Sequence, residues 1–202
     1  MNILIVAANP AGTSLCNALA DVCIAAVKGL GHRVVFHDLY REKFQPVLAA
    51  EELLRGNRPG PVLGRHCRDL RGADGIIIVH PNWWGQPPAV LTGWIDRVFR
   101  PGVAYRFKED DKGEGVPEGL LKARFALVLN TSNTKKRREM EEFGDPLDTI
   151  WRNCVFGLCG VRHVVRRTYG VVVTSSLPQR KAWLKDAVKT VRKIVRKMDH
   201  HG

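Results

Sequence analysis

The chain has 202 residues and a mass of 22.6 kDa, which suits one domain and is long enough to bury a full hydrophobic core. Its 45% hydrophobic and 26% charged residues are the proportions of an ordinary globular protein. The net charge of +12 would suit an anionic partner, so the placement of the basic residues decides how this charge is interpreted.

Much of the positive charge falls in the C-terminal segment, where apolar residues recur with the spacing of a helix. The stripe consists of Leu184, Val188, Val191, Val195 and Met198. The lysines and arginines between these positions then occupy the solvated face of an amphipathic helix. Because no nucleic-acid-binding motif accompanies the charge, we expect no nucleic-acid partner, although the charge alone keeps DNA binding as an alternative.

The N-terminal sequence and the cysteines favour a cytoplasmic protein. The apolar run that begins at Met1 has no basic region before it and no cleavage signature after it, so we expect no secretory signal. No apolar run approaches the roughly 20 residues that span a bilayer. The five cysteines are odd in number and never spaced C-x-x-C, so we expect neither a disulfide framework nor a metal site.

Short apolar runs alternate with helical patterns along the chain, which predicts βαβ units around a parallel sheet. We expect strands at residues 3–8, 33–37, 75–79, 125–129 and 169–173. A first helix follows the periodic apolar residues from Leu15 to Ala26, and another follows those from Val90 to Val98. Residues 55–64 and 101–119, which are broken by glycine and proline, are expected to be connections.

Five strands in this alternation predict an α/β fold with a doubly wound parallel sheet of order 2-1-3-4-5. No internal repeat or shift of composition marks a second unit, so residues 1–202 are expected to form a single domain. Ligands of such sheets bind at the carboxyl ends of the strands, beside the switch point. The loops that should meet there are the most unusual stretches of the sequence, at residues 9–14, 80–87 and 130–134.

The first of these loops carries hydroxyl side chains at the start of a helix. Thr13 and Ser14, with Asn17 one turn further on, can cap free backbone N–H groups, and the same N–H groups attract a phosphate. An ordinary helix cap is the commoner use of such residues. The loop matches neither G-x-G-x-x-G nor G-x-x-x-x-G-K-[ST], which argues against a Rossmann dinucleotide site and a nucleotide-hydrolysing loop.

The other two loops offer aromatic and polar groups. Trp83 and Trp84 either pack under their own loop or form an aromatic wall for a flat cofactor ring, and we favour the wall. Residues 131–133, with the sequence Thr-Ser-Asn, either donate hydrogen bonds to the electron-rich edge of a cofactor or form an ordinary polar turn. The convergence of three such loops on one crevice favours a cofactor site.

Four stretches of the chain resemble one family. They are Asn9-Pro10-x-x-Thr13-Ser14-x-x-Asn17; Asp38-Leu39-Tyr40 with Phe44-x-Pro46-Val47-Leu48 and Glu51; Pro81-x-Trp83-Trp84 with the run from Pro88 to Phe99; and Ala104-Tyr105-x-Phe107. The third stretch is the most specific. Over most of the chain they resemble the flavodoxin-like NAD(P)H quinone reductases, which include bacterial ancillary proteins of potassium efflux and mammalian quinone reductases.

The resemblance implies a flavodoxin-like fold, bound FMN (with FAD as the alternative) and NAD(P)H as the hydride donor. Hydride would pass by a ping-pong mechanism to the flavin and then to a quinone or similar small acceptor. A homodimer is also implied, in which Tyr105 and Phe107 reach the substrate pocket of the partner. The cofactor-binding residues expected from the loops and the resemblance are Asn9, Thr13, Ser14, Asn17, Pro81, Asn82, Trp83, Trp84, Gly85, Thr131, Ser132 and Asn133.

The chain departs from the family at two places. Asn9 stands where the family usually has histidine, and Thr-Ser-Asn at residues 131–133 replaces the usual Thr-Gly-Gly. The tyrosine and histidine that follow in mammalian members have no counterpart in residues 135–143, so no catalytic proton donor is assigned. His80 is expected to be a hydrogen-bonded group at the end of a strand.

The resemblance also keeps a second class of function open. The family includes flavin-binding regulatory subunits of membrane transport systems, in which turnover is incidental and a basic surface suits an anionic partner or a cytoplasmic leaflet. A one-electron carrier fits less well, because carriers of that type resemble acidic proteins. The sequence does not determine the physiological acceptor or the choice between NADH and NADPH.

Overall fold

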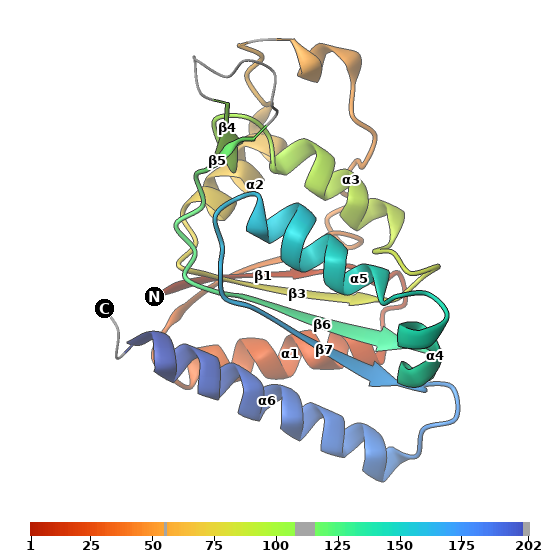
Figure 1. Ribbon diagram of the computed structural model, residues 1–202. Coiled ribbons are helices and arrows are strands. Elements are labelled where there is room, and N and C mark those ends of the chain that lie inside the picture. The colour runs from red at the N-terminus through yellow and green to blue at the C-terminus, as the bar shows by residue number, and fades with distance from the viewer. Residues whose placement is uncertain (55, 108–115, 200–202) are drawn as a thin grey trace.

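A five-stranded parallel sheet forms the centre of the computed structural model, which describes residues 1–54, 56–107 and 116–199 (Figure 1). The strand order is β2-β1-β3-β6-β7. The strands are β1 (Asn2–Ala7), β2 (Arg33–Asp38), β3 (Gly75–Pro81), β6 (Ala126–Ser132) and β7 (Val164–Gly170). When the five strands of the sheet are numbered in the order of the chain, their order across the sheet is 2-1-3-4-5. This confirms the predicted flavodoxin-like arrangement.

Helices cover both faces of this sheet (Figure 1). On one face lie α1 (Leu15–Lys28) and α6 (Leu177–Asp199); on the other lie α2 (Pro61–Arg71), α3 (Ala89–Val98), α5 (Pro146–Thr149) and the π-helix η2 (Ile150–Gly157) that continues α5. Successive side chains of β1 point to opposite faces of the sheet. Ile3 and Ile5 pack with α1 and α6, whereas Leu4 and Val6 pack in the core on the opposite face. Every residue of β3 and β6 is buried, as expected for central strands covered on both sides.

Four short elements lie at the periphery. They are the 3₁₀ turn η1 (Ala50–Leu53), the antiparallel pair β4 (Tyr105–Arg106) and β5 (Glu118–Gly119), and α4 (Lys136–Glu141). The acidic stretch at 109–115 and the two tail histidines fall outside the described residues. None of the helices described is both long enough and apolar enough to cross a membrane.

The structure corrects two boundaries expected from the sequence. The fifth strand is β7, at Val164–Gly170, and not residues 169–173. Residues 61–64, expected to belong to a connection, form the first turn of α2, with Pro61 at its first position. Both errors arise where charged residues or glycine and proline interrupt the apolar pattern on which the prediction depends.

Candidate functional site

Side-chain and backbone hydrogen bonds tie the three expected loops together at the carboxyl ends of β1, β3 and β6. The Cys16 thiol, at the start of α1, lies 3.1 Å from the hydroxyl of Thr131 at the end of β6. The backbone N–H of Asn82, just after β3, donates to the carbonyl of Thr131 at 2.7 Å. Thr131 therefore links the second and third loops to the start of α1, directly after the first loop, so the three loops lie together as the switch-point rule predicts.

The first loop is held by its own polar side chains. Asn9 accepts a hydrogen bond from the N–H of Ala11 at 2.9 Å, and Ser14 caps α1 by accepting from the N–H of Asn17 at 3.1 Å. The Asn17 amide donates to two loop carbonyls, those of Ala11 and Gly12, at 3.0 Å each. The first turn of α1 contains no acidic residue, so the positive end of its dipole is left to attract an anion.

The second loop is a tight turn that projects one tryptophan into solvent. Trp83 and Gln86 exchange two backbone hydrogen bonds, of 3.1 and 2.9 Å. The two residues between them have left-handed backbones, with φ of 57° at Trp84 and 72° at Gly85, as the two-residue turns of hairpins require. The Trp84 side chain is 99% exposed and that of Trp83 43% exposed, so the alternative in which both pack under the loop is wrong for Trp84.

Asn82 connects this turn to a helix that the sequence analysis did not implicate. Its side-chain oxygen accepts from the N–H of Gly85 at 3.0 Å, and its amide donates to the carboxylate of Glu139 at 3.0 Å. Glu139 lies on α4 and is only 8% exposed. Sequence reasoning missed Glu139 because α4 falls in the stretch where the family's tyrosine and histidine have no counterpart, and one glutamate in a charged hexapeptide carries no signal of its own.

The third loop has two buried members and one exposed member. Thr131 and Ser132 are 8% and 5% exposed, whereas Asn133 faces solvent. Ser132 accepts from the N–H of Thr134 at 3.0 Å, and Asn133 accepts from the N–H of Val173, beyond β7, at 3.0 Å. The polar side chains of this loop thus fix its backbone at the edge of the predicted crevice.

Different cavities border the tryptophan turn and Tyr105. A cavity of about 650 Å³ is lined by Trp83 and Trp84 together with Pro46 and Val47. Tyr105 lines a different cavity, of about 460 Å³. Within one chain, therefore, Tyr105 does not share a cavity with the tryptophan turn. Phe107 is half exposed and makes an edge contact with Tyr105, their ring centres being 5.6 Å apart.

His80 is a neutral, fully buried group at the end of β3. Its Nδ1 donates to the carbonyl of Pro81 at 2.8 Å, which leaves Nε2 to accept from the indole N–H of Trp151 at 3.0 Å and the amide of Asn130 at 2.7 Å. Burial lowers the pKa of His80 to about 4, although the bond to Pro81 acts in the opposite direction. These contacts confirm the expectation of a hydrogen-bonded strand end.

Comparison with known proteins agrees with this architecture. A family model described as the flavodoxin-like fold matches residues 1–194, and the chain therefore belongs to this family. It is 34% identical over 203 aligned residues, or 96% of each chain, to an uncharacterized NAD(P)H oxidoreductase of Haemophilus influenzae. The length of this match shows that the chain is similar to that relative throughout, and not only at the most specific stretch.

Two further relatives extend the comparison. An FMN-dependent NADH:quinone oxidoreductase of Pelagibacter ubique is 26% identical over 73% of this chain and 77% of the relative. The solved NAD(P)H:quinone oxidoreductase of Methanothermobacter marburgensis is 24% identical, with a TM-score of 0.80 and coverage of 96% of both chains. This structural likeness establishes the fold. The activities named for the relatives apply to this chain only where its own site supports them.

Proposed function

We propose that the protein is an FMN-dependent NAD(P)H oxidoreductase that reduces a quinone or a similar small acceptor. The observation that carries the proposal is the junction at Thr131, where three polar loops meet beside an exposed tryptophan. Family membership and the NAD(P)H oxidoreductase of Haemophilus influenzae support the same class of chemistry. Bound FMN would accept hydride from NAD(P)H and deliver it to the acceptor in a second step.

The residues at the start of α1 suit the phosphate of FMN. Thr13 is exposed, and Ser14 with Asn17 fixes the loop so that the N–H groups of the first helical turn face outward from the helix end. No carboxylate in that turn opposes a phosphate. Asn9 shapes the same loop through Ala11, which is a positioning role and requires no contact between Asn9 and the cofactor.

The turn from Pro81 to Gly85 suits the flavin ring. The Asn82 side chain accepts from the N–H of Gly85 and donates to Glu139, and these two hydrogen bonds fix the turn. The exposed ring of Trp84 is left to provide a flat apolar face. The backbone of residues 131–133 supplies polar groups at the same edge of the sheet. His80 contributes no proton near neutral pH, because both of its nitrogens are engaged and its pKa is about 4.

The proposal includes a homodimer and a single domain of residues 1–202. Tyr105 lies on β4 and Phe107 directly follows it; the β4–β5 pair stands away from the sheet in Figure 1, and Tyr105 borders a cavity other than the one that Trp83 and Trp84 line together. In the proposed homodimer, these two aromatic rings cover the substrate pocket of the partner subunit. Cytoplasmic location remains a prediction from the sequence.

Steady-state kinetics with NADH or NADPH and a soluble quinone test the proposal. A ping-pong enzyme gives parallel double-reciprocal lines when both substrates are varied. A chain that binds FMN but oxidises NAD(P)H no faster than free FMN does would favour the alternative of a transporter's regulatory subunit. Intersecting lines would retain the oxidoreductase and reject the ping-pong mechanism.

A further inference from the structure

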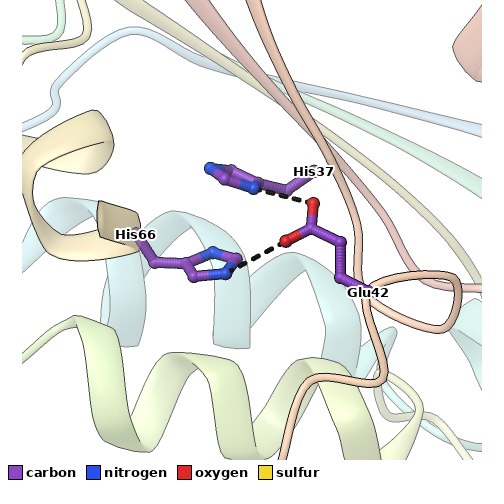
Figure 2. A group of neighbouring side chains, drawn as sticks. All are labelled: His37, Glu42 and His66. Atoms are coloured by element: carbon purple, nitrogen blue, oxygen red, sulfur yellow. Dashed lines mark hydrogen bonds and ion pairs between the residues drawn. The ribbon is translucent and has the colours of Figure 1, made fainter. Parts of the chain in front are cut away.

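Two histidines and a glutamate from three separate segments meet away from the three loops (Figure 2). His37 is on β2, Glu42 is in the turn after β2, and His66 is on α2. One ring nitrogen of each histidine and an oxygen of the carboxylate all lie within 4.8 Å of one another. The histidine side chains are 4% and 0% exposed, and that of Glu42 is 23% exposed, so the cluster is buried with one side toward solvent.

The hydrogen bonds of the two rings leave their inner nitrogens facing the same carboxylate. His37 donates through Nε2 to Asp69 at 2.9 Å, and its Nδ1 lies 2.9 Å from Oε1 of Glu42. His66 accepts the indole N–H of Trp94 at Nδ1, at 3.2 Å. Its Nε2 lies 3.3 Å from Oε2 of Glu42, yet forms no hydrogen bond of acceptable geometry with any residue that the structure describes.

We propose that His37, Glu42 and His66 form a binding site for one divalent transition-metal cation of the zinc class. Imidazole nitrogen with a single carboxylate is a donor set for zinc, whereas magnesium and calcium require more oxygen ligands. Donor atoms around a tetrahedral zinc ion lie roughly 3.4 Å apart, given bonds of about 2.1 Å. The two nitrogen–oxygen separations of 2.9 and 3.3 Å are close to that spacing, and the two rings, whose centres are 4.0 Å apart and whose planes differ by 31°, would turn toward each other to bind the ion.

Asp69 gives the site an outer partner. A metal-binding histidine normally donates its other N–H to a carboxylate, which fixes the orientation and tautomer of the ring. His37 has this arrangement, with Nε2 bound to Asp69 and Nδ1 turned inward.

Two groups compete with the ion. The Arg65 guanidinium lies 2.8 Å from Oε2 of Glu42, but it is 52% exposed and can swing into solvent. Because Trp94 donates to Nδ1 of His66, the neutral ring carries its proton on Nε2, and the ion must displace that proton. The displaced proton moves to Nδ1 by exchange with solvent, so the ring binds as a neutral imidazole at the expense of the indole hydrogen bond, and the carboxylates of Glu42 and Asp69 balance the two charges of the ion.

The site would join β2, the turn after it and α2. The same turn continues to Pro46, which lines the cavity of Trp84. The Phe44 ring meets that of His66 edge-on, with ring centres 5.0 Å apart. A bound ion would therefore brace one wall of that cavity. Metal binding and flavin binding are separable, since no residue of the cluster belongs to the three loops.

Titration with Zn²⁺ against a coloured competing chelator tests the proposal. The protein is first stripped with EDTA, and His200 and His201 are replaced by alanine so that the tail does not bind zinc. We expect one ion per chain. Asp69→Asn should weaken binding about 10- to 100-fold, the range for loss of a ligand's carboxylate partner, and Glu42→Gln, which removes a direct ligand, should weaken it at least as much. Arg65→Gln should tighten binding several-fold, because it removes the competing cation.

The direction in which each variant changes zinc affinity distinguishes loss of a binding site from loss of the fold. Arg65→Gln keeps the proposal falsifiable if Glu42→Gln is unstable, because loss of a half-exposed arginine side chain should leave the fold intact while it tightens binding. His32→Gln is the matched control, because His32 also pairs with a carboxylate, Asp199, at 3.0 Å, and its loss should leave affinity unchanged. Co²⁺ should give visible bands without a thiolate charge-transfer band. Substoichiometric binding, or affinities equal in all variants, would overturn the proposal.

Discussion

Trp84 combines two properties that are each costly. Its backbone is left-handed, with φ of 57°, and its indole is 99% exposed. Trp84→Ala should therefore leave the free energy of unfolding nearly unchanged, because the ring buries almost nothing and alanine meets the same backbone strain. FMN affinity should fall by about 1 kcal/mol or more, roughly fivefold, through loss of an aromatic stack.

Equilibrium titration of Trp84→Ala and Trp84→Phe with FMN checks this prediction. The phenylalanine variant should keep most of the affinity, since it retains a flat apolar ring at the same position. If alanine and tryptophan bind FMN equally well, Trp84 is not part of the flavin site.

His80 should make the folded protein sensitive to mild acid. In the unfolded chain this histidine takes up its proton near pH 6.5, and in the folded chain only near pH 4. Between these values the unfolded state binds more protons, so stability falls as pH decreases. The cost is about 2 kcal/mol between pH 7 and pH 5, and about 3 kcal/mol once the pH is below both values.

Denaturant unfolding at pH 7 and pH 5 isolates this contribution when His80→Gln is compared with the parent chain. Glutamine keeps an acceptor for the indole of Trp151 but does not titrate. The parent should lose about 2 kcal/mol more than the variant over this interval. Equal losses in the two proteins would show that His80 is not the group responsible.

Among the elements, α3 and the turn after β2 approach each other as closely as their backbones permit. A Cβ atom on Gly93 would lie 2.1 Å from the carbonyl oxygen of Pro46, so Gly93→Ala must push the two segments apart. We expect a loss of about 1–3 kcal/mol in the free energy of unfolding, as for other overpacked sites.

Gly64→Ala on α2 is the matched control. A Cβ atom at Gly64 first meets the end of the Arg68 side chain, at 3.4 Å, and alanine favours helix over glycine by up to about 1 kcal/mol. Gly64→Ala should thus be neutral or stabilising in a denaturant melt. A Gly93→Ala variant as stable as Gly64→Ala would mean that the Pro46 turn is free to move.

The sheet order could be predicted because β1, β3 and β6 are continuous apolar runs joined by helical patterns. The limits of β7 could not, because Arg166 and Arg167 interrupt its apolar pattern on the edge of the sheet. The start of α2 was hidden in the same way by Gly60 and Pro61, which resemble a connection and in fact cap and open the helix.

The candidate site was predictable to the level of its loops. Topology alone indicates that residues 9–14, 80–87 and 130–134 converge. It does not indicate which side chains form the bridges, so the Cys16–Thr131 contact and the buried Glu139 came only from the structure. The cluster of His37, Glu42 and His66 escaped notice because its spacing matches no metal-binding motif, and only the packing of α2 on β2 brings it together.

At the scale of the whole molecule, the proposed dimer assigns a role to Tyr105. Light scattering should give twice the chain mass of 22.6 kDa at micromolar concentration. Tyr105→Ala should raise KM for the quinone about three- to tenfold, the equivalent of 0.5–1.5 kcal/mol for one desolvated aromatic contact. FMN occupancy and the rate of flavin reduction should stay nearly unchanged, because Tyr105 is expected to touch only the acceptor.

Stopped-flow spectroscopy separates that role from packing within the same subunit. A slowed reductive phase with normal reoxidation would place Tyr105 on the nicotinamide side. An unchanged KM accompanied by lower stability would assign it to the chain's own core. A mass near that of one chain would remove the basis for a contribution across subunits.

The measurement that tests the central claim most directly is a titration of the purified protein with FMN, followed by absorbance and by flavin fluorescence. The three loops that meet at Thr131 predict saturable binding of one FMN per chain at low micromolar concentration or tighter. Protein that shows no flavin absorbance as purified and no binding at tens of micromolar FMN would contradict the account.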